Sequence, residues 1–252
     1  MNDEIESALK NYFIAMHSKK KENLNERLDK SNNAALFYFW SGPGTGKTRN
    51  LHEFPNLCLN IIQKLQKENE EMPTFEKKPF IFNINMENGH SKLACDNPVY
   101  EVGFRMFFQC RTNPQSKWND LVNQHQNDYN SLPEEVLKKL GITKNDLVIF
   151  LVDGVLMFDK MYQSKNSNPQ NRPSATVAQY LSDLMRHPFS PYTIVAISSL
   201  SFSPMYPSGD SHVNLTPIRL DPYKIDPSLP KDNLVLKTLF EYMDGHGRTL
   251  QF

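Results

Sequence analysis

Apolar and polar residues alternate along this chain with helical and strand-like periods in turn. The first segment, residues 3–28, has a helical pattern whose apolar positions are Ile5, Leu9, Tyr12, Phe13 and Met16. Further helical patterns predict helices at residues 48–54, 57–70, 97–109, 117–126, 133–140, 175–185 and 233–243. Pro55 is expected to interrupt the second helix, and the polar residues 163–172 are expected to form a loop.

Five segments have the pattern of β-strands: residues 35–40, 80–86, 146–152, 192–197 and 213–220. Residues 147–152, LVIFLV, are a continuous apolar run, which indicates a strand buried on both faces, as in a parallel sheet. Strands and helices alternate along the chain, and this order predicts helices on both faces of a mostly parallel sheet. The predicted fold class is therefore α/β, a three-layer sandwich. Residues 1–30 are expected to form an N-terminal helical segment before a core at 34–252.

The bulk composition describes an ordinary globular chain with no global charge bias. The 252 residues are 39% hydrophobic, and 28 basic residues balance 28 acidic ones. This balance gives no indication of a nucleic-acid partner or an anionic membrane surface. The N-terminus MNDEIESALKNYF is acidic, without the apolar run of a signal peptide, and no apolar stretch reaches 18 residues. We therefore expect an intracellular protein, in cytoplasm or nucleus, that does not span a membrane.

The cysteines agree with a reducing compartment. Cys58, Cys95 and Cys110 are an odd number and form no C-x-x-C pair. This pattern favours buried free thiols over a disulfide framework or a zinc site.

A cluster of glycines follows the first predicted strand. The chain has only 10 glycines, and Gly42, Gly44 and Gly46 lie within five positions, directly before Lys47-Thr48. A strand, a glycine-rich turn and a helix that opens on Lys-Thr form the layout of a phosphate-binding loop. Ser41 stands where the strict pattern has glycine, and Gly42 could form the tight turn instead. The alternative is a glycine-rich turn that precedes Lys-Thr by chance.

The loop chemistry assigns a role to each part of this segment. Backbone N–H groups of the loop would point at phosphate oxygens, and the helix that follows would add its positive dipole end. Lys47 would reach the β- and γ-phosphates as a catalytic cation, and the Thr48 hydroxyl would hold Mg²⁺. The predicted nucleotide-binding residues are Gly42, Pro43, Gly44, Thr45, Gly46, Lys47, Thr48 and Arg49, and the predicted cofactors are ATP and Mg²⁺.

An acidic residue at the end of another buried strand would complete a metal site. The run LVIFLV ends at Asp153, which could hold Mg²⁺ opposite Thr48, or could simply cap the turn at Gly154. Many ATPases with a phosphate-binding loop have Glu directly after that Asp to activate water, and this chain has Gly154. Glu87 could supply the missing base from the end of the second strand, and Asp159 could supply it from a loop. The alternative for Glu87 is a solvated turn residue.

Two further positions could contact phosphate. Ser198 and Ser199 end the fourth strand, where they could contact a γ-phosphate or attacking water, or serve as turn residues. Arg248, in a late glycine-containing turn, could stabilise phosphate charge, and the same turn could be a helix C-cap at Gly245.

The loop GPGTGKTR resembles the Walker A motif of the AAA+ and STAND branches of P-loop ATPases. A wider set of segments resembles the NTPase domain of Crinkler-type effector proteins and the related retrotransposon-hot-spot NTPases. The segments are GTGKTRNLHEFP, FNINMENG, YEVGFRMFF, the Ser-Ser-Leu after the fourth strand and GHGRTLQF. The resemblance covers residues 34–252.

The resemblance implies an ATPase module, often joined to a nuclease or another toxic domain. It also implies a helical lid that contributes a sensor arginine, and Arg248 occupies the matching position. The chain stops at Phe252, where a lid would only begin, so the lid is expected to be truncated or absent. Crinkler-type proteins are often exported effectors, so the resemblance also allows export.

Three functions remain open from the sequence. The first is a Mg²⁺-dependent ATPase with weak hydrolysis. The second is a nucleotide-binding switch or scaffold that barely turns over and acts through a protein partner or self-association. The third, a small-molecule kinase, is disfavoured because no compact Arg cluster lies between the third and fourth strands.

Overall fold

The structure is a computed structural model. It describes residues 2–22, 36–40, 47–68, 72–86, 93, 97–110, 117–124, 131–162, 172–187, 190–199 and 216–219. The helices are α1 (Asn2–Lys21), α2 (Lys47–Glu68), α3 (Pro98–Gln109), α4 (Trp118–Gln124), α5 (Pro133–Lys139), α6 (Met157–Tyr162) and α7 (Pro173–Arg186). The strands are β1 (Leu36–Trp40), β2 (Phe80–Asn85), β3 (Leu147–Asp153), β4 (Tyr192–Ser199) and β5 (Thr216–Arg219).

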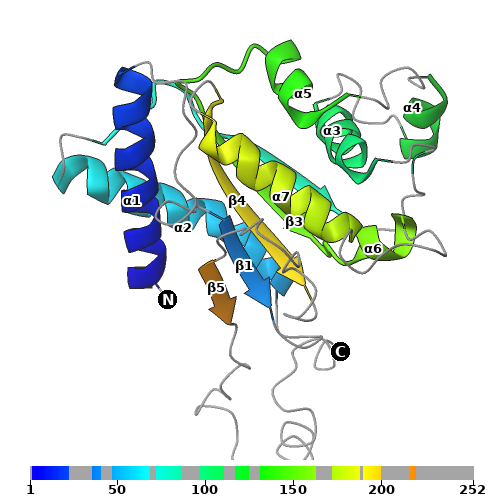
Figure 1. Cartoon of the computed structure of the whole chain (residues 1–252), viewed down its shortest axis with the longest axis horizontal. Coiled ribbons are helices and arrows are strands. Elements are labelled where there is room, and N and C mark those ends of the chain that lie inside the picture. The colour runs from blue at the N-terminus through cyan, green and yellow to red at the C-terminus, as the bar shows by residue number, and fades with distance from the viewer. Residues whose placement is uncertain are drawn as a thin grey trace, which may run out of the picture.

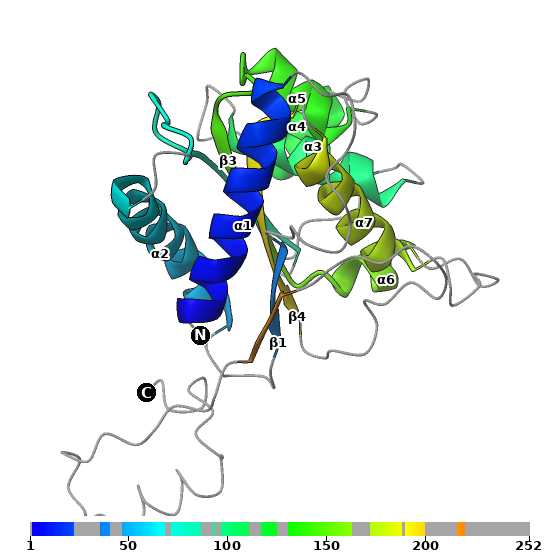
Figure 2. The same ribbon diagram turned by 60° about the vertical axis from the view of Figure 1, so that its left-hand side comes forward.

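The strands form one sheet in the order β2-β3-β4-β1-β5, and every pair in it is parallel. Helix α2 covers one face of the sheet, while α3, α6 and α7 lie on the other (Figures 1 and 2). Helix α1 packs beside α2. The prediction of an α/β fold with helices on both faces of a parallel sheet is confirmed. No helix in the described part of the chain is long and apolar enough to cross a membrane.

The core lies on both faces of the two central strands. Every residue of β3 and β4 is buried, as the continuous apolar run of residues 147–152 predicts. The five apolar positions of the predicted first helix are also completely buried in this core, so α1 packs as its pattern predicts. Tyr12 connects α1 to α7 and to β4. Its hydroxyl donates to the Met185 carbonyl at 3.2 Å and accepts from Thr193 N–H at 2.8 Å.

The expected interruption of the second helix at Pro55 is wrong. The helix continues from Lys47 to Glu68 with Pro55 inside it. A proline in a helix interior costs about 3 kcal/mol, because it removes a hydrogen bond and clashes with the preceding turn. Pro55 is buried together with Phe54 and Cys58, and Phe54 packs on Phe37 and Phe39 of β1. This tertiary packing outweighs the local preference.

Helix α6 is the element that the sequence analysis missed. It has only six residues, too few to establish a helical period, and directly follows the turn at Gly154. The predicted helix at residues 233–243 and the expected lid lie outside the described residues.

Helix α3 is held at both ends by specific contacts. The Asn97 side chain caps it by accepting a hydrogen bond from Val99 N–H at 3.0 Å. At its other end the Gln109 side chain exchanges two hydrogen bonds with the main chain of Asn83 on β2, accepting from the N–H at 2.9 Å and donating to the carbonyl. In the middle, Gly103 lies against the backbone at Ser131, where a Cβ atom would come within 2.0 Å of the carbonyl oxygen.

Candidate functional site

The carboxyl ends of the parallel strands meet at one edge of the sheet. The chain leaves β1 toward β2 at one side of the sheet, whereas it leaves β4 toward β5 at the other. The strand order therefore reverses between β1 and β4. Crevices at such a switch point, outside the carboxyl ends of the strands, are where open α/β sheets bind ligands.

Thr48 and Asp153 meet at this edge. Thr48 lies in the first turn of α2, and Asp153 is the last residue of β3. The Thr48 hydroxyl donates a hydrogen bond of 2.8 Å to Asp153 Oδ2, although the two residues are 105 positions apart. Asp153 is 4% exposed, so its polar oxygens need hydrogen-bond partners within the protein. The fold thus brings together the two residues that the sequence pairs as metal ligands, and the metal role itself stays a prediction.

Ser198 joins the same group from β4. Its hydroxyl donates to Asp153 Oδ1 and accepts a 3.1 Å hydrogen bond from Gly154 N–H. Both carboxylate oxygens of Asp153 are therefore engaged, one by α2 and the other by β4. The sequence analysis placed Ser198 at this edge for a phosphate or water, and the structure shows it as a partner of Asp153.

Gly154 turns the chain away from the sheet. Its φ is 75°, in the left-handed region that glycine adopts without strain. A residue with a side chain would be strained there by about 1–2 kcal/mol. The backbone shape thus accounts for the glycine at residue 154, where many P-loop ATPases have a water-activating Glu.

The backbone around Asp153 is braced from both neighbouring strands. Asn85 of β2 is its register partner, and Met86 N–H donates to the Asp153 carbonyl at 3.0 Å. On the other side, Val155 N–H donates to the Ser198 carbonyl at 3.2 Å. These bonds fix the end of β3, so the position of the carboxylate is set by the sheet.

The other predicted site residues divide into those that the structure describes and those outside it. Lys47 is the first residue of α2 and is half-buried. Arg49 is exposed and pairs with Glu53 at 2.9 Å along the helix surface. The residues outside the described part are Gly42, Pro43, Gly44, Thr45, Gly46, Glu87 and Arg248.

Asp159 has a structural role that differs from the expected loop position. It lies in α6, is 8% exposed, and accepts hydrogen bonds from Ser174 N–H and the Ser174 hydroxyl, both at 2.9 Å. Its carboxylate thus satisfies the open N-terminus of α7. Ser199 is also buried, and its side chain shares a hydrogen bond with Tyr38 of β1.

A buried ion pair beside the edge was not found from the sequence. Glu101 and Arg105, one turn apart on α3, pair at 2.8 Å with side chains 0% and 5% exposed. Arg105 Nη1 also donates to the Asn85 carbonyl at 2.7 Å. The sequence does show a Glu and an Arg four residues apart within an apolar helical segment. A pair at this spacing is usually interpreted as a surface ion pair, so the spacing alone does not predict burial.

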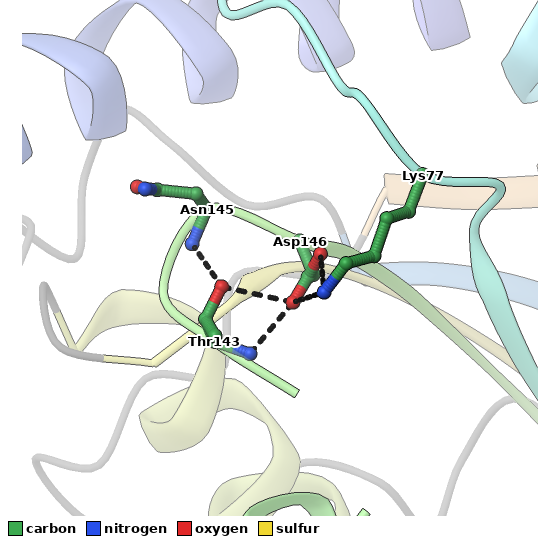
Figure 3. A network of polar contacts seen from close by, with 4 residues as sticks. All are labelled: Lys77, Thr143, Asn145 and Asp146. Atoms are coloured by element: carbon green, nitrogen blue, oxygen red, sulfur yellow. Dashed lines mark hydrogen bonds and ion pairs between the residues drawn. The ribbon is translucent and has the colours of Figure 1, made fainter. Parts of the chain in front are cut away.

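A different polar network lies at the opposite, amino end of the sheet. Asp146 Oδ2 accepts hydrogen bonds from the N–H and hydroxyl of Thr143 at 2.7 and 2.9 Å, and Lys77 pairs with Oδ1 at 3.3 Å (Figure 3). Burial acts to raise the pKa of Asp146, but these hydrogen bonds and the Lys77 charge outweigh it and lower the pKa below its ordinary value.

Lys20 lies next to this turn. Its ammonium donates to the carbonyls of Lys144 and Ser190 and lies 4.3 Å from the centre of the Tyr192 ring. Burial lowers the pKa of Lys20 to about 7, and the like charge of Lys144 adds to this.

The described cysteines are not among the residues of the candidate site. Cys58 is a buried free thiol, as expected, and burial raises its pKa well above the ordinary value. Cys110 is also free but exposed, because it caps the end of α3, so the expectation of burial is wrong there. Cys95 lies outside the described residues. Among those residues, no three His, Cys, Asp or Glu side chains gather as a metal site.

Comparison with known proteins finds a distant similarity at the level of sequence. The chain is 26% identical to Crinkler effector protein 108 from Phytophthora sojae over 240 residues, which cover 88% of this chain. The chain spans 27% of the length of that relative. No family model matches the sequence. The Crinkler-like resemblance is supported at this distance, and it extends over most of the chain.

Proposed function

We propose that this chain binds Mg·ATP at residues 42–48 together with Asp153, and that it hydrolyses the nucleotide slowly. One observation carries the proposal, the hydrogen bond between Thr48 and Asp153 at the carboxyl edge of the sheet, one strand from the switch point. A glycine-rich loop before α2 would place phosphates at the N-terminus of that helix, where Lys47 begins it.

The residues at the edge suit a hard cation. A hydroxyl and a carboxylate oxygen are ligands that Mg²⁺ accepts, and the usual site takes one or two protein oxygens with phosphates and water. When bound, Mg²⁺ would neutralise charge on the phosphates. The chain's own contribution is to hold Thr48 and Asp153 together, while Ser198 fixes the second oxygen of the carboxylate.

Slow hydrolysis follows from Gly154. A positioned general base contributes about 10²–10⁴-fold to such a reaction, and the glycine at residue 154 supplies no carboxylate. Glu87 is the proposed replacement. If the Glu87→Gln variant keeps the full rate of phosphate release, Glu87 is not the base.

The direct test is a binding titration with ATP and with GTP, each with and without Mg²⁺, followed by phosphate release on the same samples. Lys47→Ala should abolish binding, since it removes the cation that contacts the β- and γ-phosphates. Lys64→Ala is the matched control. Lys64 lies on the same helix and pairs with Glu6 at 2.7 Å. Absence of nucleotide binding by the wild-type chain would refute the proposal.

A non-hydrolysing switch or scaffold is the second candidate, and the backbone at Gly154 favours it. Mg²⁺-dependent binding with no phosphate release above background would select the switch. Slow release that depends on Lys47 would select the ATPase. A protein partner or self-association would then transmit the bound state.

The biological setting is proposed from the relative alone. That relative is described as an effector and is much longer than this chain. We propose that this chain is the nucleotide-binding module of a Crinkler-like protein, so export as an effector and a separate toxic domain belong to the same proposal. Detection of the full-length protein outside the producing cell would test the export step.

A further inference from the structure

Helix α3 carries a buried pair that the proposed nucleotide site does not use directly. Glu101 is completely buried, and Arg105 is 4% exposed. A buried charge pair is costly to form, and removal of one partner is strongly destabilising because the other charge is left uncompensated. The contacts of the pair therefore identify the parts of the chain that it holds together.

Glu101 collects donors from three parts of the chain. Its Oε1 accepts from Arg105 Nε at 2.9 Å on the same helix. Its Oε2 accepts from the Leu93 N–H at 3.0 Å and from the Tyr162 hydroxyl at 2.8 Å. The carboxylate thus ties α3 to the segment before it and to α6.

Arg105 extends the connection to the sheet. Its Nη1 donates to the Asn85 carbonyl at 2.7 Å, and its guanidinium stacks 4.7 Å from the centre of the Trp118 ring on α4. Asn85 is the last residue of β2 and the register partner of Asp153. The pair therefore reaches the residue next to the proposed metal ligand.

Both sides of Asp153 depend on this connection. On the β2 side, Arg105 holds Asn85, and the following Met86 N–H donates to the Asp153 carbonyl. On the downstream side, α6 begins four residues after Asp153, and Tyr162 at its end binds Glu101. A shift of α3 would move both supports at once.

We propose that Glu101, Arg105 and Tyr162 form a positioning clamp that holds Asp153 opposite Thr48. The effect on nucleotide binding rests on the proposed function, whereas the effect on the backbone does not. The three residues touch neither Thr48 nor Asp153 directly in the contacts described above, and they act through Asn85, Met86 and α6.

The test uses Tyr162→Phe, which removes one hydroxyl and keeps the ring. Tyr192→Phe is the matched control, because Tyr192 also loses one side-chain hydrogen bond, to His17 at 2.9 Å, at the opposite end of the sheet. Arg105→Lys is the second variant, and it keeps the positive charge without the planar guanidinium group that can donate several hydrogen bonds at once. Each is compared with the wild-type chain.

The first measurement is amide exchange at Met86 and Val155, which needs no nucleotide. Tyr162→Phe should speed exchange at both about tenfold, because a hydrogen bond to a buried charge is lost from their support. The Tyr192 amide, which donates to the Asp146 carbonyl at 2.9 Å, should not change. Unchanged exchange at Met86 and Val155, or an equal increase at all three amides, would overturn the clamp.

The second measurement is the ratio of nucleotide Kd in EDTA to Kd in Mg²⁺. Displacing Asp153 should reduce this ratio about 3–10-fold in Tyr162→Phe and leave it unchanged in Tyr192→Phe. A purely structural role would lower the melting temperature with the ratio intact, and that result also contradicts the proposal. If the wild-type chain binds no nucleotide, the proposed function fails, and the amide exchange alone decides the clamp.

Discussion

A buried aspartate lies at each end of β3, Asp146 directly before the strand and Asp153 as its last residue, and their partners differ. Asp146 at the start is bound by its own turn, through Thr143 three residues before it, and by Lys77 (Figure 3). Asp153 at the end is bound by side chains from α2 and β4, 105 and 45 positions away. At the amino end the hydrogen bonds from Thr143 lie within one turn and Lys77 is the distant partner, whereas both side-chain partners at the carboxyl end come from distant parts of the chain.

This difference separates a stabilising carboxylate from a candidate functional one. Local hydrogen bonds of the Asp146 kind form in many turns, because they satisfy backbone N–H groups nearby. The Asp153 contacts form only when α2, β3 and β4 pack together, and they lie at the carboxyl edge, where open α/β sheets bind ligands.

The sharpest test replaces Asp153 with Ala. We expect the affinity for Mg²⁺-nucleotide to fall about 100-fold, or about 2.7 kcal/mol, because one of the two proposed metal ligands is lost. Binding in EDTA should change far less. Isothermal titration of both forms measures this, and an unchanged Mg²⁺ dependence would remove Asp153 from the metal site.

The matched replacement of Asp146 with Ala should give the reverse result. The free energy of unfolding should fall by about 2 kcal/mol, because Thr143 and Lys77 lose a charged acceptor. The pKa of Asp146 is lowered in the folded state, so this stabilisation is present above the ordinary carboxyl pKa and is lost as the pH falls through the folded value. Denaturation at pH 7 and pH 3 checks both points, and a loss of nucleotide affinity here would break the comparison.

Two glycines in turns before and after β3 offer a second matched pair, Gly141 just after α5 and Gly154 just after β3. Gly141 and Gly154 have φ values of 68° and 75°, so alanine should cost about 1–2 kcal/mol of stability at either one. Only Gly154 is joined to the Asp153 group, through Ser198. Weaker nucleotide binding is therefore expected for Gly154→Ala alone, and equal effects of the two variants on binding would contradict the distinction.

The smallest expected effect is a pH dependence at the amino end. Because the folded pKa of Lys20 is about 7 and the ordinary value is 10.5, the unfolded chain holds more protons between these values. Stability should therefore rise with pH in that window, by about 1 kcal/mol between pH 7 and 8. Denaturant titrations of wild type and Lys20→Met at several pH values measure the difference, which a flat profile would contradict.

Most of the fold follows from the sequence because its strands and long helices have clear periods. The buried run of residues 147–152 identifies the central strand, and the apolar positions of the first helix identify its packed side. Pro55 shows the limit, since its local preference is overcome by packing that no periodicity describes. Helix α6 is too short to show any period.

The site follows from the sequence only in part. Thr48 and Asp153 are recognisable because each ends a pattern, one a glycine-rich turn and the other an apolar run. Glu101 and Arg105 are not, because burial of a charged pair depends on what surrounds α3 in space. The same holds for Asp159, whose partner Ser174 is 15 positions away on another helix.

The Gln109 side chain covers part of one edge of the sheet. Strand β2 is one of the two outer strands of the described sheet, and Gln109 takes both main-chain hydrogen bonds of Asn83 in place of a further strand. An exposed strand edge is a template for aggregation and for pairing with other chains, and proteins commonly cover it. In a longer, multidomain protein, a neighbouring domain could extend the sheet at Asn83 only by displacing Gln109.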